Sequence, residues 1–175
     1  MKYLVFSDIH GSLESVEFML KKLVETNADK CLCLGDFLYH GPRNDLPEDY
    51  NPKAVIPLLN SIKDKIIAIR GNCDSEVDQM VLEFSMMEDR HVFDLGKRKL
   101  MMTHGHLNLP LVNIDIILSG HTHIPRADRE EGIIVLNPGS ITMPKGGYDR
   151  SYGVLTEDEF IVLSRDEEIL MQIEF

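Results

Sequence analysis

The sequence predicts an α/β fold in which two β-sheets pack face to face and helices cover the outside. The first part of the chain alternates apolar strands with amphipathic helices, the pattern of βαβ units. From residue 91 onwards the sequence changes to short strands separated by turns. Apolar strands in both parts need cover on both faces, which two stacked sheets with outer helices provide.

The first βαβ unit opens the chain. Residues 2–6 form an apolar strand, and residues 30–34 form a second one in which Cys and Leu alternate. Between them, apolar residues recur at helical spacing over residues 12–26, so a helix capped by Ser12 or Gly11 is expected there. The two strands should therefore run parallel, joined by a right-handed crossover.

The middle of the chain continues this alternation. A loop rich in Pro, Gly, Asn and Asp covers residues 40–51, and Pro52 is expected as the first residue of a helix. Pro57 must kink that helix or delay its start. Residues 66–69 form a third short strand, and a short helix is expected over residues 74–82.

The strand-rich part begins with a predicted hairpin around a Gly-Lys turn. The strands of this part are expected at residues 91–94, 99–102, 114–118, 133–136, 153–155, 160–163 and 169–173. The sequence shows no internal repeat, linker or low-complexity segment. Residues 1–175 are therefore expected to form a single domain.

Composition narrows the classes of partner. The net charge is −11 and no basic cluster is longer than residues 97–99, which argues against a nucleic-acid polymer. No segment approaches the roughly 18 apolar residues of a membrane span, and the first apolar run is too short for a secretion signal. Three cysteines do not make a disulfide framework. A cytoplasmic protein with no membrane partner is therefore expected.

Polar side chains stand just past the ends of five apolar strands. In open α/β sheets, ligands bind outside the carboxyl ends of strands. If the five strand ends lie together, they contribute two carboxylates, one amide and four imidazoles. These side chains belong to Asp8, His10, Asp36, Asn72, His104, His121 and His123.

This donor set indicates a metal site. Oxygen and imidazole donors without a thiolate suit Mn²⁺, Fe²⁺, Co²⁺, Ni²⁺ or Zn²⁺ better than Ca²⁺ or Mg²⁺. Seven ligands are too many for one ion with an open position, but they fit two ions that share a carboxylate. Two divalent ions against two aspartates leave a charge of about +2, which attracts a phosphate ester despite the acidic surface. A binding module with a single ion is the simpler alternative.

Each of these motifs has an ordinary explanation when taken alone. A lone Asp-x-His or His-x-His is more often a turn or a surface pair, and Asn72 after Gly71 would be read as a turn residue. The joint pattern is different, because four of the seven histidines in the chain are among these side chains and a fifth, His106, follows two residues after His104. The sequence therefore favours a functional site over coincidence.

The order of the motifs along the chain carries a family resemblance. They read Asp8-x-His10, Gly35-Asp36, Gly71-Asn72, Thr103-His104-Gly105-His106 and Gly120-His121-Thr122-His123, and residues 40–44, 70–80, 137–140 and 144–147 match as well. With this series, the sequence resembles the calcineurin-like metallophosphoesterases, and within them a group of bacterial phosphodiesterases. The resemblance covers essentially the whole chain.

The resemblance implies a four-layer αββα sandwich, with two mixed β-sheets flanked by helices and a dinuclear site usually assayed with Mn²⁺. Carried over by motif, one ion takes Asp8, His10, Asp36 and His123, and the other takes Asp36, Asn72, His104 and His121. These seven are thus the implied catalytic and metal-binding residues, with Asp36 as the bridge. A metal-bound hydroxide then attacks phosphorus, because coordination lowers the pKa of the bound water.

One position departs from the wider superfamily. Many members have a histidine after the metal-binding asparagine, and that histidine can protonate the leaving group. Cys73 stands there in this chain. A thiol with a reference pKa of roughly 8.5 is a poorer proton donor to an alkoxide than an imidazolium. We expect a preference for diesters with good leaving groups, such as aryl esters; the alternative is that Cys73 only packs.

Contacts to substrate are expected from Cys73, Arg43 and His106. Arg43 could hold a phosphate oxygen through two hydrogen bonds, or it could form a salt bridge that holds its own loop. Arg70 is a further candidate. His106 and His40 flank ligands and are expected to orient a ligand or the substrate rather than to bind metal.

Alternatives to a phosphodiesterase remain. A phosphomonoesterase or a cyclic-nucleotide phosphodiesterase would use the same site. A non-catalytic scaffold is a third alternative, since a retromer subunit of this fold has a degraded metal site, but here every ligand position carries a competent residue. The short stretch 106–113 leaves no room for a large cap, which suits an open site and a small phosphodiester substrate. A homo-oligomer is left open, because oligomers are common among such enzymes.

Overall fold

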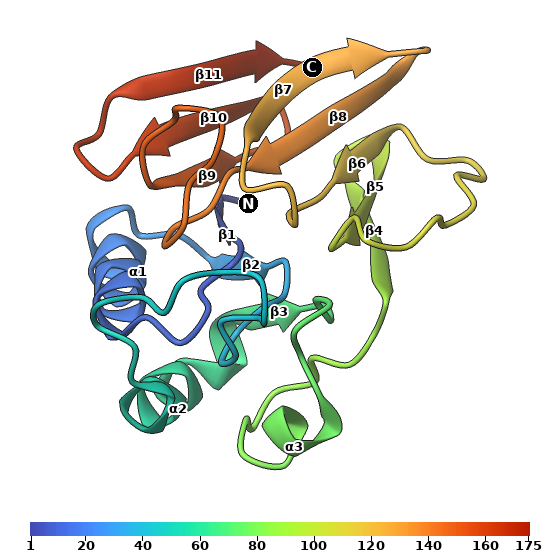
Figure 1. The fold of residues 1–175 in the computed structure, drawn as a ribbon. Coiled ribbons are helices and arrows are strands. Elements are labelled where there is room, and N and C mark those ends of the chain that lie inside the picture. Colours follow the sequence, from blue (N-terminus) through green and yellow to red (C-terminus); the bar gives the residue numbers. More distant parts are fainter.

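Two mixed β-sheets pack face to face in the computed structural model, which describes residues 1–175 (Figure 1). The strands are β1 Tyr3–Phe6, β2 Lys30–Cys33, β3 Ile66–Ala68, β4 Arg90–Leu95, β5 Arg98–Thr103, β6 Ile116–Leu118, β7 Pro125–Glu130, β8 Ile133–Pro138, β9 Ser151–Leu155, β10 Glu159–Ser164 and β11 Ile169–Glu174. The six-stranded sheet has the order β11-β10-β9-β1-β2-β3, and the five-stranded sheet has the order β4-β5-β6-β8-β7.

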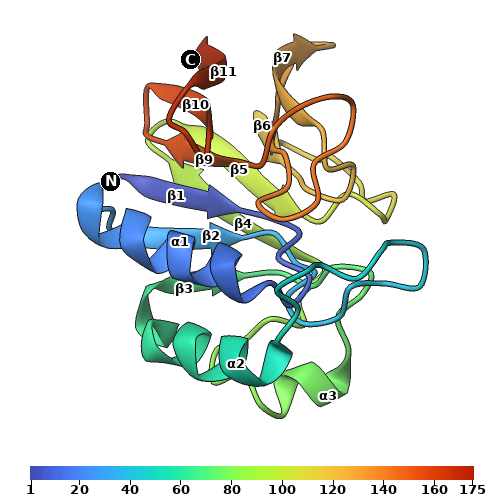
Figure 2. The ribbon, with the colours of Figure 1, turned by 60° about the vertical axis from the view of Figure 1, so that its left-hand side comes forward.

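The helices are few and lie in the first half of the chain. They are α1 Leu13–Glu25, α2 Pro52–Ser61, the 3-10 helix η1 Lys63–Lys65 and α3 Glu76–Gln79. In Figure 2, α1 and α2 lie on one side of β1, β2 and β3, and the five-stranded sheet lies on the other. None of the helices has the length and apolar character needed to cross a membrane. The predicted α/β fold, with two mixed sheets flanked by helices, is confirmed.

Alternation along the strands explains the two cores. Leu4 and Phe6 of β1 face the helices, whereas Tyr3 and Val5 face the other sheet, and all four are buried. The cysteines of β2 join the helix-side core, while Leu32 joins the core between the sheets. Strands with both faces covered read as continuous apolar runs, which is how the sequence shows them.

One helix boundary agrees with the expectation and another differs. The helix α2 begins at Pro52, as expected, and continues through Pro57, so the internal proline does not delay its start. The expected helix over residues 74–82 is only one turn, Glu76–Gln79. There the amide of Gln79 donates to the carbonyls of Leu82 and Phe84, which replaces further helical turns by a loop.

Strand β7 was not expected from the sequence. It is an edge strand paired antiparallel with β8, and its second half is exposed. Edge strands facing water lack the apolar alternation that identifies a strand, and they commonly carry charged side chains instead.

The topology brings the polar strand ends together. Strands β1, β2 and β3 are mutually parallel, and so are β5, β6 and β8 of the other sheet. In Figure 2 the loop of residues 39–50 and the loop of residues 140–150 extend from the same end of the molecule. The candidate site residues lie at this end, where the chain leaves the parallel strands.

Candidate metal centre

The backbone at the strand ends is strained at the candidate residues. Asp8, His10, Asp36, His121 and His123 all have positive φ angles, between 49° and 66°. The chain has nine non-glycine residues with positive φ, so more than half of them are in this site. Such conformations are costly for residues other than glycine and persist where the surroundings fix them, most often at functional sites. The tight turns aim these side chains into one space.

The carboxylate of Asp8 is the centre of the cluster. Its Oδ2 accepts hydrogen bonds from the hydroxyl of Ser7 at 2.5 Å and from the backbone N–H of His121 at 3.1 Å. Its Oδ1 is buried and has no hydrogen-bond partner. That oxygen lies 3.1 Å from His123 Nε2, 3.7 Å from His10 Nε2 and 4.0 Å from His104 Nε2.

Backbone carbonyls fix how the three buried imidazoles point. Nδ1 of His10 lies 2.9 Å from the Tyr39 carbonyl, Nδ1 of His104 lies 2.6 Å from that of Leu34, and Nδ1 of His123 lies 2.5 Å from that of Met143. A carbonyl only accepts, so each Nδ1 must carry the donated proton, and each Nε2 faces inward. In the neutral ring, Nε2 then presents a lone pair to the carboxylates.

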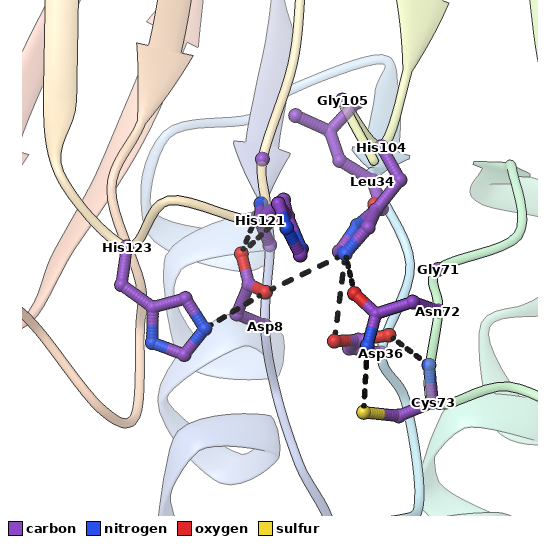
Figure 3. Close-up of polar contacts among 12 residues, drawn as sticks. Asp8, Leu34, Asp36, Gly71, Asn72, Cys73, His104, Gly105, His121 and His123 are labelled. Atoms are coloured by element: carbon purple, nitrogen blue, oxygen red, sulfur yellow. Dashed lines mark hydrogen bonds and ion pairs between the residues drawn. The ribbon is translucent and has the colours of Figure 1, made fainter. Parts of the chain in front are cut away.

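Lone pairs that converge on carboxylate oxygens repel them unless a proton or a metal cation lies between. The Nε2 atoms of His10 and His123 are 3.4 Å apart, and both face Asp8 (Figure 3 shows His123 pointing at it). Ring nitrogens of this kind, with Nδ1 held by a backbone carbonyl, are the usual arrangement of metal-binding histidines. The unpartnered Asp8 oxygen and these nitrogens therefore fit a divalent ion.

Asp36 lies between two groups of nitrogen donors. Its Oδ2 is 3.7 Å from His10 Nε2 and 3.5 Å from His104 Nε2, while Oδ1 accepts the backbone N–H of Cys73 at 2.8 Å. Asp36 thus contacts both sides of the cluster, as a shared ligand must. Three sets of side chains could each hold an ion, with their ligand atoms within 4.8 Å of one another: Asp8, His10 and His123; Asp8, Asp36 and His104; and His10, Asp36 and Cys73.

The remaining candidates, Asn72 and His121, are more open. Asn72 is exposed, and its Oδ1 lies 3.1 Å from His104 Nε2 (Figure 3). His121 is partly buried, and its ring centre is 5.1 Å from that of His104. The ring of His121 is outside all three ligand sets. The structure therefore places it beside the cluster, with its backbone bound to Asp8.

Protons take part in the charge balance of the cluster. Burial alone would lower the pKa of His104, but Asp36 and Asp8 outweigh it and raise that pKa to about 9. Burial would likewise raise the pKa of Asp8, but the imidazoles of His10 and His123 hold it well below its usual range. Burial and the nearby His104 lower the pKa of His121. A metal ion would have to displace the proton of His104 on binding.

A polar cavity of about 800 Å³ opens onto the cluster. Twelve of its fourteen lining residues are polar or small, and they include Asp36, Asn72, His121 and His123. Cys73 also lines it. Burial, with Asp36 nearby, raises the pKa of the Cys73 thiol to about 12, so the side chain is a neutral thiol.

The other predicted side chains fall into two groups. Arg43 lines the cavity and no carboxylate lies within 4.0 Å of it, so the predicted alternative of a loop salt bridge is wrong. Arg70 instead pairs with Asp89 at 2.9 Å, outside the cavity. His106 packs edge-on against His104, at 5.3 Å between ring centres, and does not line the cavity. His40 packs edge-on against Tyr39 and does not reach the cluster.

The sequence did not single out three residues of this region. Tyr39 and Lys145 line the cavity, and the Lys145 backbone N–H donates to the His123 carbonyl at 3.1 Å. Asp74 accepts three backbone hydrogen bonds beneath Asp36. A signal was present for Lys145 and Asp74, since both stand in the stretches that carry the family resemblance.

Comparison with known proteins agrees with this geometry. Residues 1–159 match the calcineurin-like phosphoesterase superfamily domain. The chain belongs to this superfamily. It is 46% identical to the phosphodiesterase YfcE of Escherichia coli K12, over 99% of this chain and 97% of that protein. It is 29% identical to the probable metallophosphoesterase YsnB of Bacillus subtilis, over 89% of this chain and 84% of that one.

Solved structures of other proteins show the same architecture. The E. coli YfcE phosphoesterase superposes with a TM-score of 0.95 at 45% identity, covering 99% of this chain and 98% of the other. Vacuolar protein sorting 29 of Cryptosporidium parvum gives 0.67 at 19% identity, covering 99% and 97%, which shows likeness of fold alone. The predictions of a metallophosphoesterase and of an enzyme are confirmed.

Proposed function

We propose that this protein is a phosphodiesterase that works with two divalent metal ions. The observation that carries the proposal is the buried, unpartnered Oδ1 of Asp8, surrounded by three imidazoles whose Nε2 atoms face it. The relative that is 46% identical to this chain is named as a phosphodiesterase, which supports the proposal.

The proposed ligand assignment combines the geometry of the buried ligands with the family resemblance, which adds Asn72 and His121. Asp8, His10 and His123 form one ion site, which we call the buried half, and Asn72, His104 and His121 form the other, the open half. Asp36 lies between the halves and is assigned to both. His121 is the least constrained member, because its ring reaches the site from the cavity side.

Bound divalent ions would supply Lewis-acid activation of the phosphoester and of a water molecule. The chain's own residues do the rest. The carbonyl-bound imidazoles and the strained turns hold the ligand atoms in place before substrate arrives, so little reorganisation is needed. Arg43 and Lys145 line the cavity without acidic partners and supply positive charge to an anionic substrate. No side chain is required to form a covalent bond with phosphorus.

We infer Mn²⁺ as the working ion, because the donors are carboxylate, amide and imidazole and the one nearby sulfur is a neutral thiol. A small diester is the proposed substrate, since the net charge of −11 disfavours a nucleic-acid polymer.

We also propose that residues 1–175 form one domain, because β11 extends the six-stranded sheet beyond the matched residues 1–159. Three free cysteines favour a reducing compartment such as the cytoplasm.

A metal-dependent assay tests the proposal. The protein is freed of metal with a chelator and supplied with Mn²⁺, Ni²⁺, Zn²⁺ or Mg²⁺, and an aryl phosphodiester and the matching monoester are compared. We expect hydrolysis of the diester with Mn²⁺ and faster turnover of the diester than of the monoester. Faster monoester turnover would favour a phosphomonoesterase, and no turnover with any ion would favour a scaffold.

Two histidine variants control the assay. His121→Ala removes a proposed ligand, whereas His91→Ala removes a histidine on β4 that lies outside the cavity. We expect a large loss only for His121→Ala. Full activity of that variant would show that His121 is not a ligand.

A further inference from the structure

The carboxylate of Asp74 joins the two turns that carry Asp36 and Asn72. Its Oδ2 accepts the backbone N–H of Asp36 at 2.8 Å and that of Gly71 at 2.7 Å. Its Oδ1 accepts the backbone N–H of Phe37 at 2.8 Å. Asp74 thus binds its own turn through Gly71, and it also binds Asp36 and Phe37, which precede it by 38 and 37 positions in the sequence.

The two turns pack backbone against backbone at this point. A Cβ atom at Gly35 would collide with the backbone of Gly71, and one at Gly71 would collide with the Asp36 carboxylate. In addition, the N–H of Cys73 donates to Asp36 Oδ1 at 2.8 Å. Small relative shifts of the turns would therefore change the distance between Asp36 and Asn72 directly.

Asn72 depends on this junction more than the other proposed ligands do. The rings of His10, His104 and His123 are each held by a backbone carbonyl. The only hydrogen bonds of the Asn72 side chain are with Cys73 Sγ, at 3.2 Å, and His104 Nε2, at 3.1 Å (Figure 3). Its position must therefore come from the backbone of its turn, which Asp74 holds.

We propose that Asp74 is a positioning residue, whose carboxylate clamps the Asn72 turn onto the Asp36 turn and so sets the geometry of the open half. This inference rests on the proposed function, in which Asn72 and Asp36 bind the second ion. A carboxylate is needed because all three partners are N–H donors, and an ionised carboxylate offers only acceptors. An asparagine would turn an NH₂ group toward at least one of those donors.

The test compares Asp74→Asn with Asp78→Asn. Asp78 is a matched control, because its carboxylate accepts from the backbone and hydroxyl of Ser75 in the next turn and does not touch the Asp36 turn. In the metal-free protein, amide hydrogen exchange is measured at Asp36, Phe37 and Gly71. We expect exchange at these three amides to rise about tenfold or more in Asp74→Asn and to stay at the wild-type rate in Asp78→Asn.

Mn²⁺ titration of the same proteins provides the second readout. We expect wild type and Asp78→Asn to bind two ions. Asp74→Asn should keep the ion of the buried half and bind the other about tenfold or more weakly, with loss of the coupled two-ion signal in electron paramagnetic resonance. If Asp74→Asn does not fold, Asp74→Glu keeps the acceptors on a longer stem. It should fold and still bind the second ion more weakly.

The outcomes separate this inference from the proposed function. Unchanged exchange at the three amides, or equal weakening of both ions, would overturn the clamp. The same losses in Asp78→Asn would also overturn it, because the effect would then be general to the loop. If the wild-type protein binds no Mn²⁺, the proposed function fails, and the role of Asp74 in metal binding fails with it. Faster amide exchange in Asp74→Asn would then show only that Asp74 holds the two turns together.

Discussion

The buried half and the open half of the site are built differently. In the buried half, Asp8, His10 and His123 are all at most 3% exposed, and both rings are bound to backbone carbonyls. In the open half, only His104 has this character, while Asn72 is exposed and His121 is partly buried. The carbonyl that holds His104 belongs to Leu34, at the end of β2 in the opposite sheet.

This difference indicates a division of labour. A preorganised set of buried ligands binds an ion with little conformational cost, whereas exposed ligands must be ordered on binding. The open half, in turn, borders the cavity through which substrate would enter. We therefore expect two unequal ion sites, with the tighter ion in the buried half.

The largest loss of activity should come from a substitution that affects both ion sites at once. Asp36→Asn keeps the size of the side chain and an acceptor for the Cys73 N–H, but removes the charge that faces His10 and His104. We expect diester hydrolysis to fall by about 1,000-fold or more, since loss of a single preorganised group can cost that much. Activity and bound Mn²⁺ are measured together; two tightly bound ions in this variant would contradict the shared role of Asp36.

Two variants that each remove a ligand from one half should show that the two ion sites respond differently. For Asn72→Ala we expect the Mn²⁺ concentration for half-maximal activity to rise about 10- to 100-fold, with activity recovered at high Mn²⁺. For His123→Ala we expect weaker binding of the first ion and no recovery, because the variant loses the buried ring nitrogen that faces Asp8 Oδ1 at 3.1 Å and is proposed to bind the same ion. If both variants recover alike, the two halves are equivalent.

A variant of Cys73 tests whether a side chain in the open half protonates the leaving group. The side chain lines the cavity as a neutral thiol, so it is a poor proton donor. We expect Cys73→His to accelerate an alkyl diester by about tenfold or more while changing an aryl diester little, because only the alkoxide needs protonation. Equal effects on both esters would mean that Cys73 only packs.

In both halves the sequence revealed where the ligands lie but not how their rings are oriented. Asp8, Asp36 and His104 follow apolar runs that read as strands, so their position at strand ends could be predicted. The carbonyls that orient the rings, such as those of Leu34 and Met143, could not be predicted, because a backbone carbonyl is the same in every residue. The pattern of side chains along the sequence predicts where the ligand residues lie. The orientation of their rings depends on backbone groups that only the fold brings into place.

The same reasoning explains the features that sequence analysis missed. The clamp by Asp74 joins turns that are far apart along the chain, and it uses backbone N–H groups, which leave no side-chain pattern. Strand β7 is an exposed edge without alternation. The helix over residues 74–82 was overestimated, because the bonds that Gln79 makes to the following loop depend on tertiary packing.

The smallest expected effect concerns the rim of the open cavity. Lys145 is exposed, no carboxylate lies within 4.0 Å of it, and its backbone is bound to that of His123. For Lys145→Ala we expect KM for an anionic diester to rise only about two- to fivefold, and less in high salt, because an exposed charge is screened by water and ions. Lys97→Ala, on the β4–β5 turn, is the matched control. The kcat should stay unchanged in both, because Lys145 binds substrate without contacting the ligand atoms; a fall in kcat with unchanged KM would place Lys145 in the chemical step instead.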